Sequence, residues 1–320
     1  MKGLTDIEGI RVGHATDHRA LTGCTVILCE QGAVAGVDIR GSASGTEEFT
    51  VLEPGHVTET IHAVVLAGGS AFGLEAASGV RRYLARQGIG FTLGGAVVPI
   101  VPCAILFDLA IGSSDVWPTR EMGEAAAAAA TTDAVQEGSV GAGTGATVGK
   151  AFGMGRAMKG GIGSATVSLG GASGARVAAL AAVNALGDVI APNPGHILAG
   201  ARTAPDSMEF ADTARHMLDG FALPESRNNT TLVVVATNAR LTKVQARKLA
   251  QLAQIGLART IRPVHTMYDG DLVMALSMGD RAANLDALGV AAAAAVEESI
   301  LRSVQYAEGR GGIPGLAAGR

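Results

Sequence analysis

Two threonines at the head of an apolar run are the first residues in this sequence that suggest chemistry. Thr230 and Thr231 follow a polar stretch at 225–229, and the run TTLVVVATNA at 230–239 is typical of a buried strand. Cleavage of the Asn229–Thr230 bond would give Thr230 a free α-amine beside its own hydroxyl. Such an amine has a pKa of about 7.7–8.0, so it can accept the hydroxyl proton near neutral pH. The alternative is that both threonines are ordinary strand formers.

Two carboxylates separated by one glycine form the second candidate group. Asp269 and Asp271 flank Gly270 in the stretch HTMYDGD at 265–271. Asp-Gly favours a tight turn, so one interpretation is a hairpin between two strands within 261–279. The other is that the two carboxylates orient a catalytic group, such as the amine of a freed Thr230.

A metal site is the third interpretation of these carboxylates, and we predict that there is none. The neighbouring residues supply no further ligands of the kind that Zn²⁺ or Ca²⁺ requires. Of the seven histidines, only His14 and His18 have the H-x-x-x-H spacing, and they lie outside the predicted helices, so they do not form a helical metal site. A structural or surface role is therefore expected for each histidine, including His265.

The glycine-rich stretch GAGTGATVGK at 141–150 does not have the spacing of a phosphate-binding loop. A Walker A loop needs G-x-x-x-x-G-K followed by Ser or Thr, and around Gly149-Lys150 both the first glycine and the final hydroxyl are missing. The dinucleotide fingerprint fits only as Gly141, Gly143 and Ala146, with no clear strand before it. We therefore predict no cofactor and expect close glycine packing. Lys150 remains unexplained by packing, and a lysine can supply positive charge where an oxyanion develops.

The composition is that of a globular protein with a large core. The 320 residues are 48% hydrophobic and 17% charged, with a mean hydropathy of +0.31, which excludes overall disorder. A net charge of −4 provides no basic surface, so nucleic acid is not expected as a partner. Cys24, Cys29 and Cys103 form no C-x-x-C pair, which argues against a disulfide framework and favours a reducing compartment.

No segment has the pattern of an export signal or a membrane span. The first residues lack the apolar stretch of a secretory signal. The most apolar run, at 97–111, contains two prolines and Asp108 and is too short to cross a bilayer. We therefore expect a cytoplasmic protein without a membrane partner.

Apolar runs alternate with alanine-rich stretches and glycine-rich joints, which predicts an α/β fold. Strands are expected at 24–29, 33–39, 62–67 and 230–239. Helices are expected at 70–88, near 207–220, after the strand at 230–239, and at 288–304. The stretches 121–130 and 176–186 fit either a helix or a buried strand.

Eight stretches together resemble one known family over nearly the whole chain. It is the family of self-processing N-terminal-nucleophile hydrolases that includes L-aminopeptidase/D-alanine esterase, β-peptidyl aminopeptidases and the 6-aminohexanoate-oligomer (nylon oligomer) hydrolase. The stretches are TDIEGIRVGHATD (5–17), VAGVDIRGSASGTEE (34–48), VVLAGGSAFGLEAASGV (64–80), VPIVPCAILFDL (98–109), GAGTGATVGK (141–150), MKGGIGSA (158–165), NNTTLVVVATNA (228–239) and HTMYDGD (265–271).

The resemblance implies an αββα-type sandwich, with residues 1–320 forming one hydrolase domain that cuts itself at Asn229–Thr230. The fragments 1–229 and 230–320 would weigh about 23 and about 9 kDa and stay associated. By the same resemblance Thr230 is the nucleophile and Asp269 and Asp271 orient its amine. Lys150 and Asn184 lie near the hydroxyl or the oxyanion, and Lys159 is the second choice for the lysine.

Two departures from the family bear on the substrate. Where the aminopeptidase members place an acidic residue for the free amine of the substrate, this chain has Cys103 and Ala104. Phe107 aligns with a tyrosine of the nylon-oligomer branch and is expected to contact the substrate. The D-x-D pattern at 269–271 resembles that branch more than the aminopeptidases.

The sequence as a whole predicts a self-processed hydrolase of small peptides, β-peptides, amino-acid amides or ω-amino-acid oligomers. A homo-oligomer of cut protomers, a tetramer, is expected from the resemblance. Two alternatives stay open at this point: a self-cleaving acyltransferase of the ornithine acetyltransferase type, and a non-catalytic member that keeps the fold.

Overall fold

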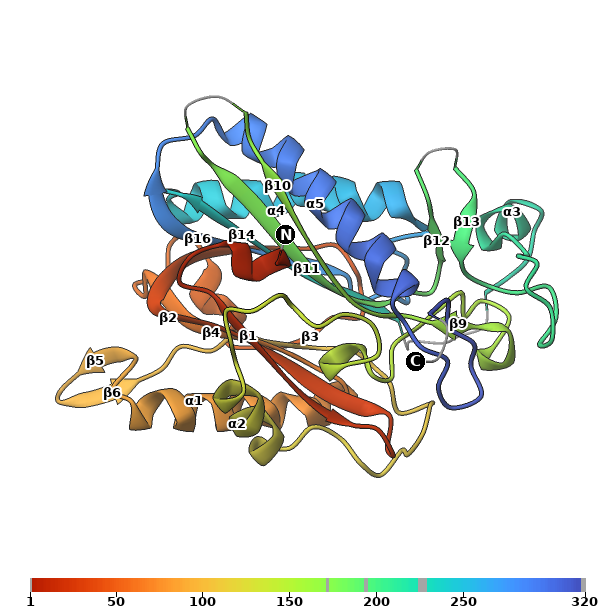
Figure 1. The fold of residues 1–320 in the computed structure, drawn as a ribbon, viewed down its shortest axis with the longest axis horizontal. Coiled ribbons are helices and arrows are strands. Elements are labelled where there is room, and N and C mark those ends of the chain that lie inside the picture. Colours follow the sequence, from red (N-terminus) through yellow and green to blue (C-terminus); the bar gives the residue numbers. More distant parts are fainter. Residues whose placement is uncertain (1, 171–172, 193–194, 224–228, 318–320) are drawn as a thin grey trace.

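A folded β-sheet lies between two layers of helices in the computed structural model, which describes residues 2–170, 173–192, 195–223 and 229–317 (Figure 1). Helices α4 (Lys243–Thr260) and α5 (Leu285–Gln305) cover one outer face, and α1 (Glu75–Arg86) and α2 (Arg120–Ala128) cover the other. The order of layers is helix, sheet, sheet, helix. The predicted αββα-type α/β sandwich is therefore confirmed.

The main sheet joins strands from both ends of the chain. Its order is β10 (Gly161–Ser168), β11 (Arg176–Asn184), β14 (Thr230–Ala239), β16 (Leu272–Arg281), β2 (Thr22–Ile39), β4 (Thr60–Ala67), β7 (Cys103–Ile105) and β3 (Gly45–Glu47), with β1 (Arg11–Asp17) also on β2. The remaining strands form smaller sheets. One of these has the order β13 (Ile197–Ala199), β12 (Asp188–Ile190) and β15 (Ile261–Arg262). The others pair β5 (Phe91–Leu93) with β6 (Ala96–Val98), and β8 (Thr147–Val148) with β9 (Met158–Lys159). A short helix, α3, spans Thr213–Leu218.

The long strand β2 belongs to both sheet layers. Its first half pairs with β1 and β4, and its second half pairs with β16. The register between β2 and β4 shifts between Leu28 and Ala33, an irregularity of the kind that bends a strand. One sheet can therefore fold into two packed layers without a break in its strand order.

Three apolar clusters separate the four layers. The central one lies between the two sheet layers and includes Ile27, Leu66 and Leu232, while Val233 faces α4 and α5 and Val65 faces α1 and α2. Adjacent residues of β14 thus enter different clusters, as the alternation of side chains along a strand requires. Burial of this strand on both faces explains why 232–236 is an apolar run without polar alternation.

Most elements predicted from the sequence are present. The stretches 24–29 and 33–39 are parts of the single strand β2, and the strands at 62–67 and 230–239 are confirmed. Of the two ambiguous stretches, 121–130 is helical as far as the end of α2 at Ala128, and 176–186 is a strand as far as the end of β11 at Asn184. The helix near 207–220 is confined to α3. Part of the polar stretch that begins at Glu225 lies outside the described residues.

The predicted hairpin over 261–279 is wrong. β15 pairs with β12, whereas β16 pairs with β14 in parallel and with β2. Parallel neighbours need a crossover connection, here α4, so 263–271 is the return of that crossover and not a turn between paired strands. Among the helices of the described ranges, none is long and apolar enough to cross a membrane.

Candidate active site

The ends of three neighbouring strands bring the predicted site residues to one edge of the sheet. β14 begins at Thr230, and β16, parallel to it, begins at Leu272, just after Asp271. β11 runs antiparallel to β14 and ends at Asn184, which is the register partner of Thr230. Asn229 forms a further bridge to Asp269. Strand register therefore collects residues that lie up to 87 positions apart in the sequence.

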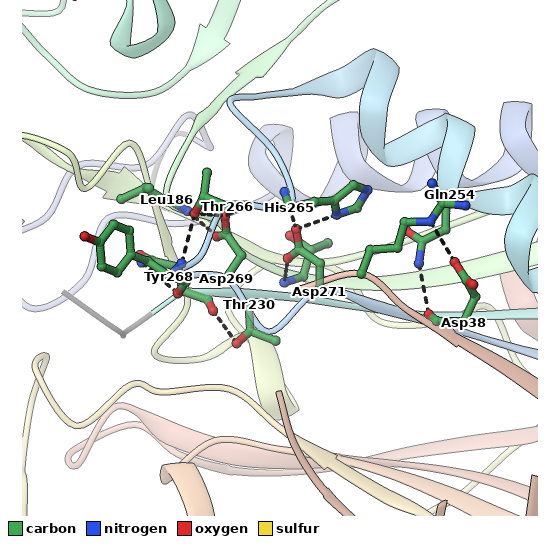
Figure 2. Close-up of polar contacts among 12 residues, drawn as sticks. Asp38, Leu186, Thr230, Gln254, His265, Thr266, Tyr268, Asp269 and Asp271 are labelled. Atoms are coloured by element: carbon green, nitrogen blue, oxygen red, sulfur yellow. Dashed lines mark hydrogen bonds and ion pairs between the residues drawn. The ribbon is translucent and has the colours of Figure 1, made fainter. Parts of the chain in front are cut away.

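The Thr230 hydroxyl lies against the peptide carbonyl that precedes it. It donates a hydrogen bond of 2.5 Å to the Asn229 oxygen (Figure 2). The Gly270 N–H donates to the same oxygen at 2.9 Å. Thr230 is 4% exposed. The hydroxyl is thus placed beside the bond predicted to be cut, and a backbone donor is already fixed on its carbonyl oxygen.

Gly270 also leaves the space that the Thr230 hydroxyl occupies. A Cβ at this position would lie 2.8 Å from Thr230 Oγ1 and 2.9 Å from the carbonyl oxygen of Ala43. Ala43 itself donates its N–H to the Asp269 carbonyl, so the loop after β2 closes over this segment. The close approach of the Thr230 hydroxyl and the Ala43 carbonyl oxygen, and not a hairpin turn, therefore explains the glycine in the D-G-D stretch.

Asp271 is buried and fully engaged by donors. Its Oδ1 accepts from the Thr231 N–H at 2.7 Å, and its Oδ2 accepts from the His265 N–H at 3.1 Å and contacts His265 Nδ1 at 3.0 Å. The carboxylate therefore reaches the backbone next to Thr230.

Asp269 is held on the other side of Gly270. Its Oδ2 accepts from the Thr266 N–H at 2.9 Å and from the Thr266 hydroxyl at 2.6 Å, and its Oδ1 accepts from the Leu186 N–H at 3.4 Å. Burial, with the charge of Asp271 as a second cause, raises the pKa of Asp269 to about 6. The charge of Asp271 is therefore close enough to act on Asp269.

Lys150 reaches the site through Asn184. Its Nζ donates to the Asn184 backbone oxygen and to Asn184 Oδ1, both at 2.9 Å, and Asn184 Nδ2 donates to the Phe107 carbonyl at 3.0 Å. Burial lowers the pKa of Lys150 to about 7, although the charges of Asp269 and Asp271 oppose the shift. A small cavity that Phe107, Lys150 and others line adjoins this group.

Lys159 occupies a different place. Its Nζ donates to the backbone oxygens of Thr144 and Ala146 at 2.8 and 2.7 Å, and the side chain is fully buried. Between them, Gly145 packs so tightly that a Cβ would lie 2.2 Å from the Leu21 oxygen. The close glycine packing predicted for 141–150 is confirmed, and Lys159 holds that segment, whereas Lys150 contacts Asn184.

Three residues of the site lay outside the sequence-based prediction. His265 was assigned a structural or surface role, and Thr266 and Gly270 were given no catalytic role. Their only signal in the sequence is proximity to Asp269 and Asp271. Two grooves, of about 630 and about 370 Å³, lie at the opposite end of the strands around Asp280, and no residue of the site lines either of them.

Within the described residues, no cluster of three or more potential metal ligands is present. The described groups around Thr230 are a hydroxyl, two carboxylates, an ammonium and backbone donors. These are the groups with which acyl transfer at an amide carbonyl is carried out.

The fold is that of the N-terminal-nucleophile (Ntn) hydrolases. L-aminopeptidase D-Ala-esterase/amidase from Ochrobactrum anthropi, a variant of this fold, matches with a TM-score of 0.73 at 23% identity over 98% of this chain and 88% of its own. A β-aminopeptidase from Burkholderia sp. matches with a TM-score of 0.70 at 23% identity over 99% and 91%.

The chain belongs to peptidase family S58, whose sequence model matches residues 2–317. An uncharacterized aminopeptidase of Mycobacterium leprae (strain TN) is 40% identical over 345 residues, covering 98% of this chain and 93% of its own length. The 6-aminohexanoate-oligomer endohydrolase of Kocuria sp. (strain KY2) is 30% identical over 316 residues, covering 94% and 85%. This chain is therefore a hydrolase of peptide or linear amide bonds, as the sequence predicted.

Proposed function

We propose that this hydrolase activates itself by cutting its own chain at Asn229–Thr230 and then uses Thr230 as the nucleophile. The observation that carries the proposal is the contact of 2.5 Å between the Thr230 hydroxyl and the Asn229 carbonyl oxygen in the uncut chain. Nucleophile and target are adjacent, and the Gly270 N–H is in place to stabilise negative charge on that oxygen.

Self-cleavage would proceed as an acyl shift from nitrogen to oxygen. Thr230 Oγ forms a bond to the Asn229 carbonyl carbon, the C–N bond of the peptide breaks, and the hydroxyl proton is transferred to the leaving nitrogen. Water then hydrolyses the ester. The products are a carboxylate on Asn229 and a free α-amine on Thr230.

The same hydroxyl would then attack a substrate amide. The freed α-amine accepts its proton, so no histidine is needed as a base. The ammonium of Lys150, held on Asn184, would supply positive charge at the oxyanion, and Asp269 and Asp271 would orient the new amine. The leaving amine takes the proton, and water resolves the acyl-enzyme.

The two fragments would remain interlocked after the cut. β14, from the small fragment 230–320, lies between β11 of the large fragment and β16, and β16 in turn pairs with β2 of the large fragment. Separation would require opening two antiparallel ladders inside the sheet. The association predicted for the fragments therefore has a physical basis.

We propose small peptides, β-peptides, amino-acid amides or ω-amino-acid oligomers as substrates. The names of the relatives, an aminopeptidase and a 6-aminohexanoate-oligomer endohydrolase, support this range. Cys103 and Ala104, which align where aminopeptidases carry an acidic residue, are fully buried in β7 and are not presented to a substrate. Substrate contact by Phe107, the tetramer and the cytoplasmic location stay predictions.

Intact-mass measurement and N-terminal sequencing of the purified protein test the proposal. We expect fragments of about 23 and about 9 kDa, the smaller beginning Thr-Thr-Leu-Val. An active protein with a single uncut chain would refute the mechanism. Addition of an acceptor amine during turnover separates hydrolysis from acyl transfer, because a transferase would yield the conjugate in place of the free acid.

A further inference from the structure

Two consecutive residues hold the two carboxylates of the site. His265 contacts Asp271 Oδ2 through its backbone N–H and its Nδ1, and Thr266 binds Asp269 Oδ2 through its backbone N–H and its hydroxyl (Figure 2). Each residue thus uses one backbone atom and one side-chain atom on one carboxylate. The arrangement fixes both the position and the rotation of each group.

The contact made by His265 extends to the strand of the nucleophile. Asp271 Oδ2 faces His265, while its Oδ1 accepts from the Thr231 N–H at 2.7 Å. The His265 side chain is 17% exposed and that of Asp271 is 2% exposed. Because so little water reaches the pair, a lost contact is not replaced by solvent, and rotation of the carboxylate would disturb the residue beside Thr230.

A histidine at position 265 is energetically unfavourable in two respects, and a role as part of a connecting loop does not explain why it is there. Its backbone has φ +55°, a left-handed conformation that glycine and asparagine adopt more readily. Its second ring nitrogen, Nε2, is buried and has no hydrogen-bond partner among the described residues. Strained residues held in place by their surroundings are concentrated at functional sites.

We propose that His265 is a positioning residue that locks the Asp271 carboxylate against the Thr231 amide and thereby holds Thr230 in place for reaction. The inference rests on the function proposed above. His265 does not contact Thr230, so it acts through Asp271 alone. Thr266 makes the equivalent contact to Asp269, but the two residues are only three positions apart, a separation that is common in ordinary turns. Substitution of His265 is therefore the clearer test of a positioning role.

Three substitutions at one position separate the ring from the backbone. His265→Ala removes the ring, His265→Gly removes it and also relaxes the left-handed backbone, and His265→Asn keeps a donor near Nδ1 and tolerates that backbone. Each variant is measured for self-cleavage by gel and for kcat and KM with an amino-acid p-nitroanilide and a 6-aminohexanoate oligomer as probes. His216→Ala, an exposed histidine on α3, is the control.

We expect Ala and Gly to lower kcat by about tenfold to 100-fold with KM unchanged, and Asn to restore most of the rate. Wild-type rates in the Gly variant, or an Asn variant as slow as Ala, would overturn the proposal. So would a raised KM with unchanged kcat, since that indicates substrate contact. If the His265→Ala variant does not fold, the kcat values of the Gly and Asn variants still test whether the side-chain donor is required.

Failure of the proposed function would look different. A wild-type chain that stays whole, or a Thr230→Ala chain that is cut, would refute Thr230 as the nucleophile. Normal processing in the wild type together with unaffected His265 variants would refute only the positioning role.

Discussion

Asn184 lies directly opposite Thr230 in the antiparallel ladder between β11 and β14. The Asn184 side chain accepts a hydrogen bond from Lys150 and donates one to the Phe107 carbonyl. The distance between the lysine and the threonine is therefore set by strand register. A slip of one residue would turn Asn184 to the other face of the sheet and remove Lys150 from the site.

Removal of the Thr230 hydroxyl should abolish processing. We expect Thr230→Ala to accumulate as one uncut, inactive chain of 32.1 kDa, because the group that contacts the Asn229 carbonyl is gone. Thr230→Ser keeps a hydroxyl and should still be cut. Mass spectrometry of both proteins checks this, and two fragments from the alanine variant would exclude Thr230 as the processing nucleophile.

A methyl group on Gly270 should slow self-cleavage. The added Cβ would lie 2.8 Å from Thr230 Oγ1 and 2.9 Å from the Ala43 carbonyl oxygen, closer than real Cβ contacts, so the atoms around it, including the hydroxyl, must shift. We expect Gly270→Ala to cut at least about tenfold more slowly. Gly155→Ala is the matched control, because a Cβ there meets nothing within 4 Å. Equal rates in the two variants would show that the hydroxyl is not confined by Gly270.

Asp271→Ala should fold and lose most of its turnover, by about 100-fold. The Thr231 N–H would be left without its acceptor, which costs about 1–3 kcal/mol, less than a folded domain of this size can lose. Thermal unfolding and steady-state kinetics measured on the same sample check both parts. Normal kinetics would mean that the carboxylate is only a structural part of the connection into β16.

The pH dependence of self-cleavage should have two limbs. Burial with the charge of Asp271 raises the pKa of Asp269 to about 6, and burial lowers the pKa of Lys150 to about 7. Asp269 is an anion only above the first value, and Lys150 is a cation only below the second. If both charged forms are used, the rate rises through about pH 6 and falls above about pH 7.

The slow Gly270→Ala precursor allows this profile to be measured after transfer to buffers of different pH. Adding Lys150→Arg should remove the falling limb, because a guanidinium stays protonated throughout the range. A falling limb that persists in this double variant would assign it to another group.

The two buried lysines should behave differently when they are replaced. Lys150→Met should lose self-cleavage, because Asn184, the register partner of Thr230, no longer carries an ammonium. Lys159→Met should still be cut, because Lys159 binds backbone oxygens of the glycine-rich segment instead. Fragment patterns on a gel distinguish them, and the reverse pattern would place Lys159 at the chemistry.

Strong local patterns made much of the fold predictable. The centre of β14, at 232–236, is apolar without a break because the strand is buried on both faces, and this pattern identified it as a strand. The polar residues around Thr230, with the family resemblance, located the site. Asn184 could be placed only through that resemblance, because nothing local distinguishes it. Lys150 stood out locally only as a lysine that glycine packing does not explain, and the resemblance was needed to place it near Thr230.

Long-range pairing was beyond the sequence. Asp269-Gly270 has the composition of a hairpin turn, and only the parallel pairing of β14 with β16 shows that α4 makes the connection. The contact of His265 to Asp271 was equally hidden, since it is made at a left-handed backbone position that no local pattern in the sequence predicts.

The position of β14 inside the sheet links maturation to folding. Thr230 meets Asn184 and Gly270, and Thr231 meets Asp271, only after β11, β14 and β16 have aligned. These strands come from distant parts of the chain. Under the proposed mechanism, an incompletely assembled chain holds no competent hydroxyl and remains an inert precursor. Self-cleavage would then occur only after the sheet has assembled, and only correctly folded molecules would become active enzymes.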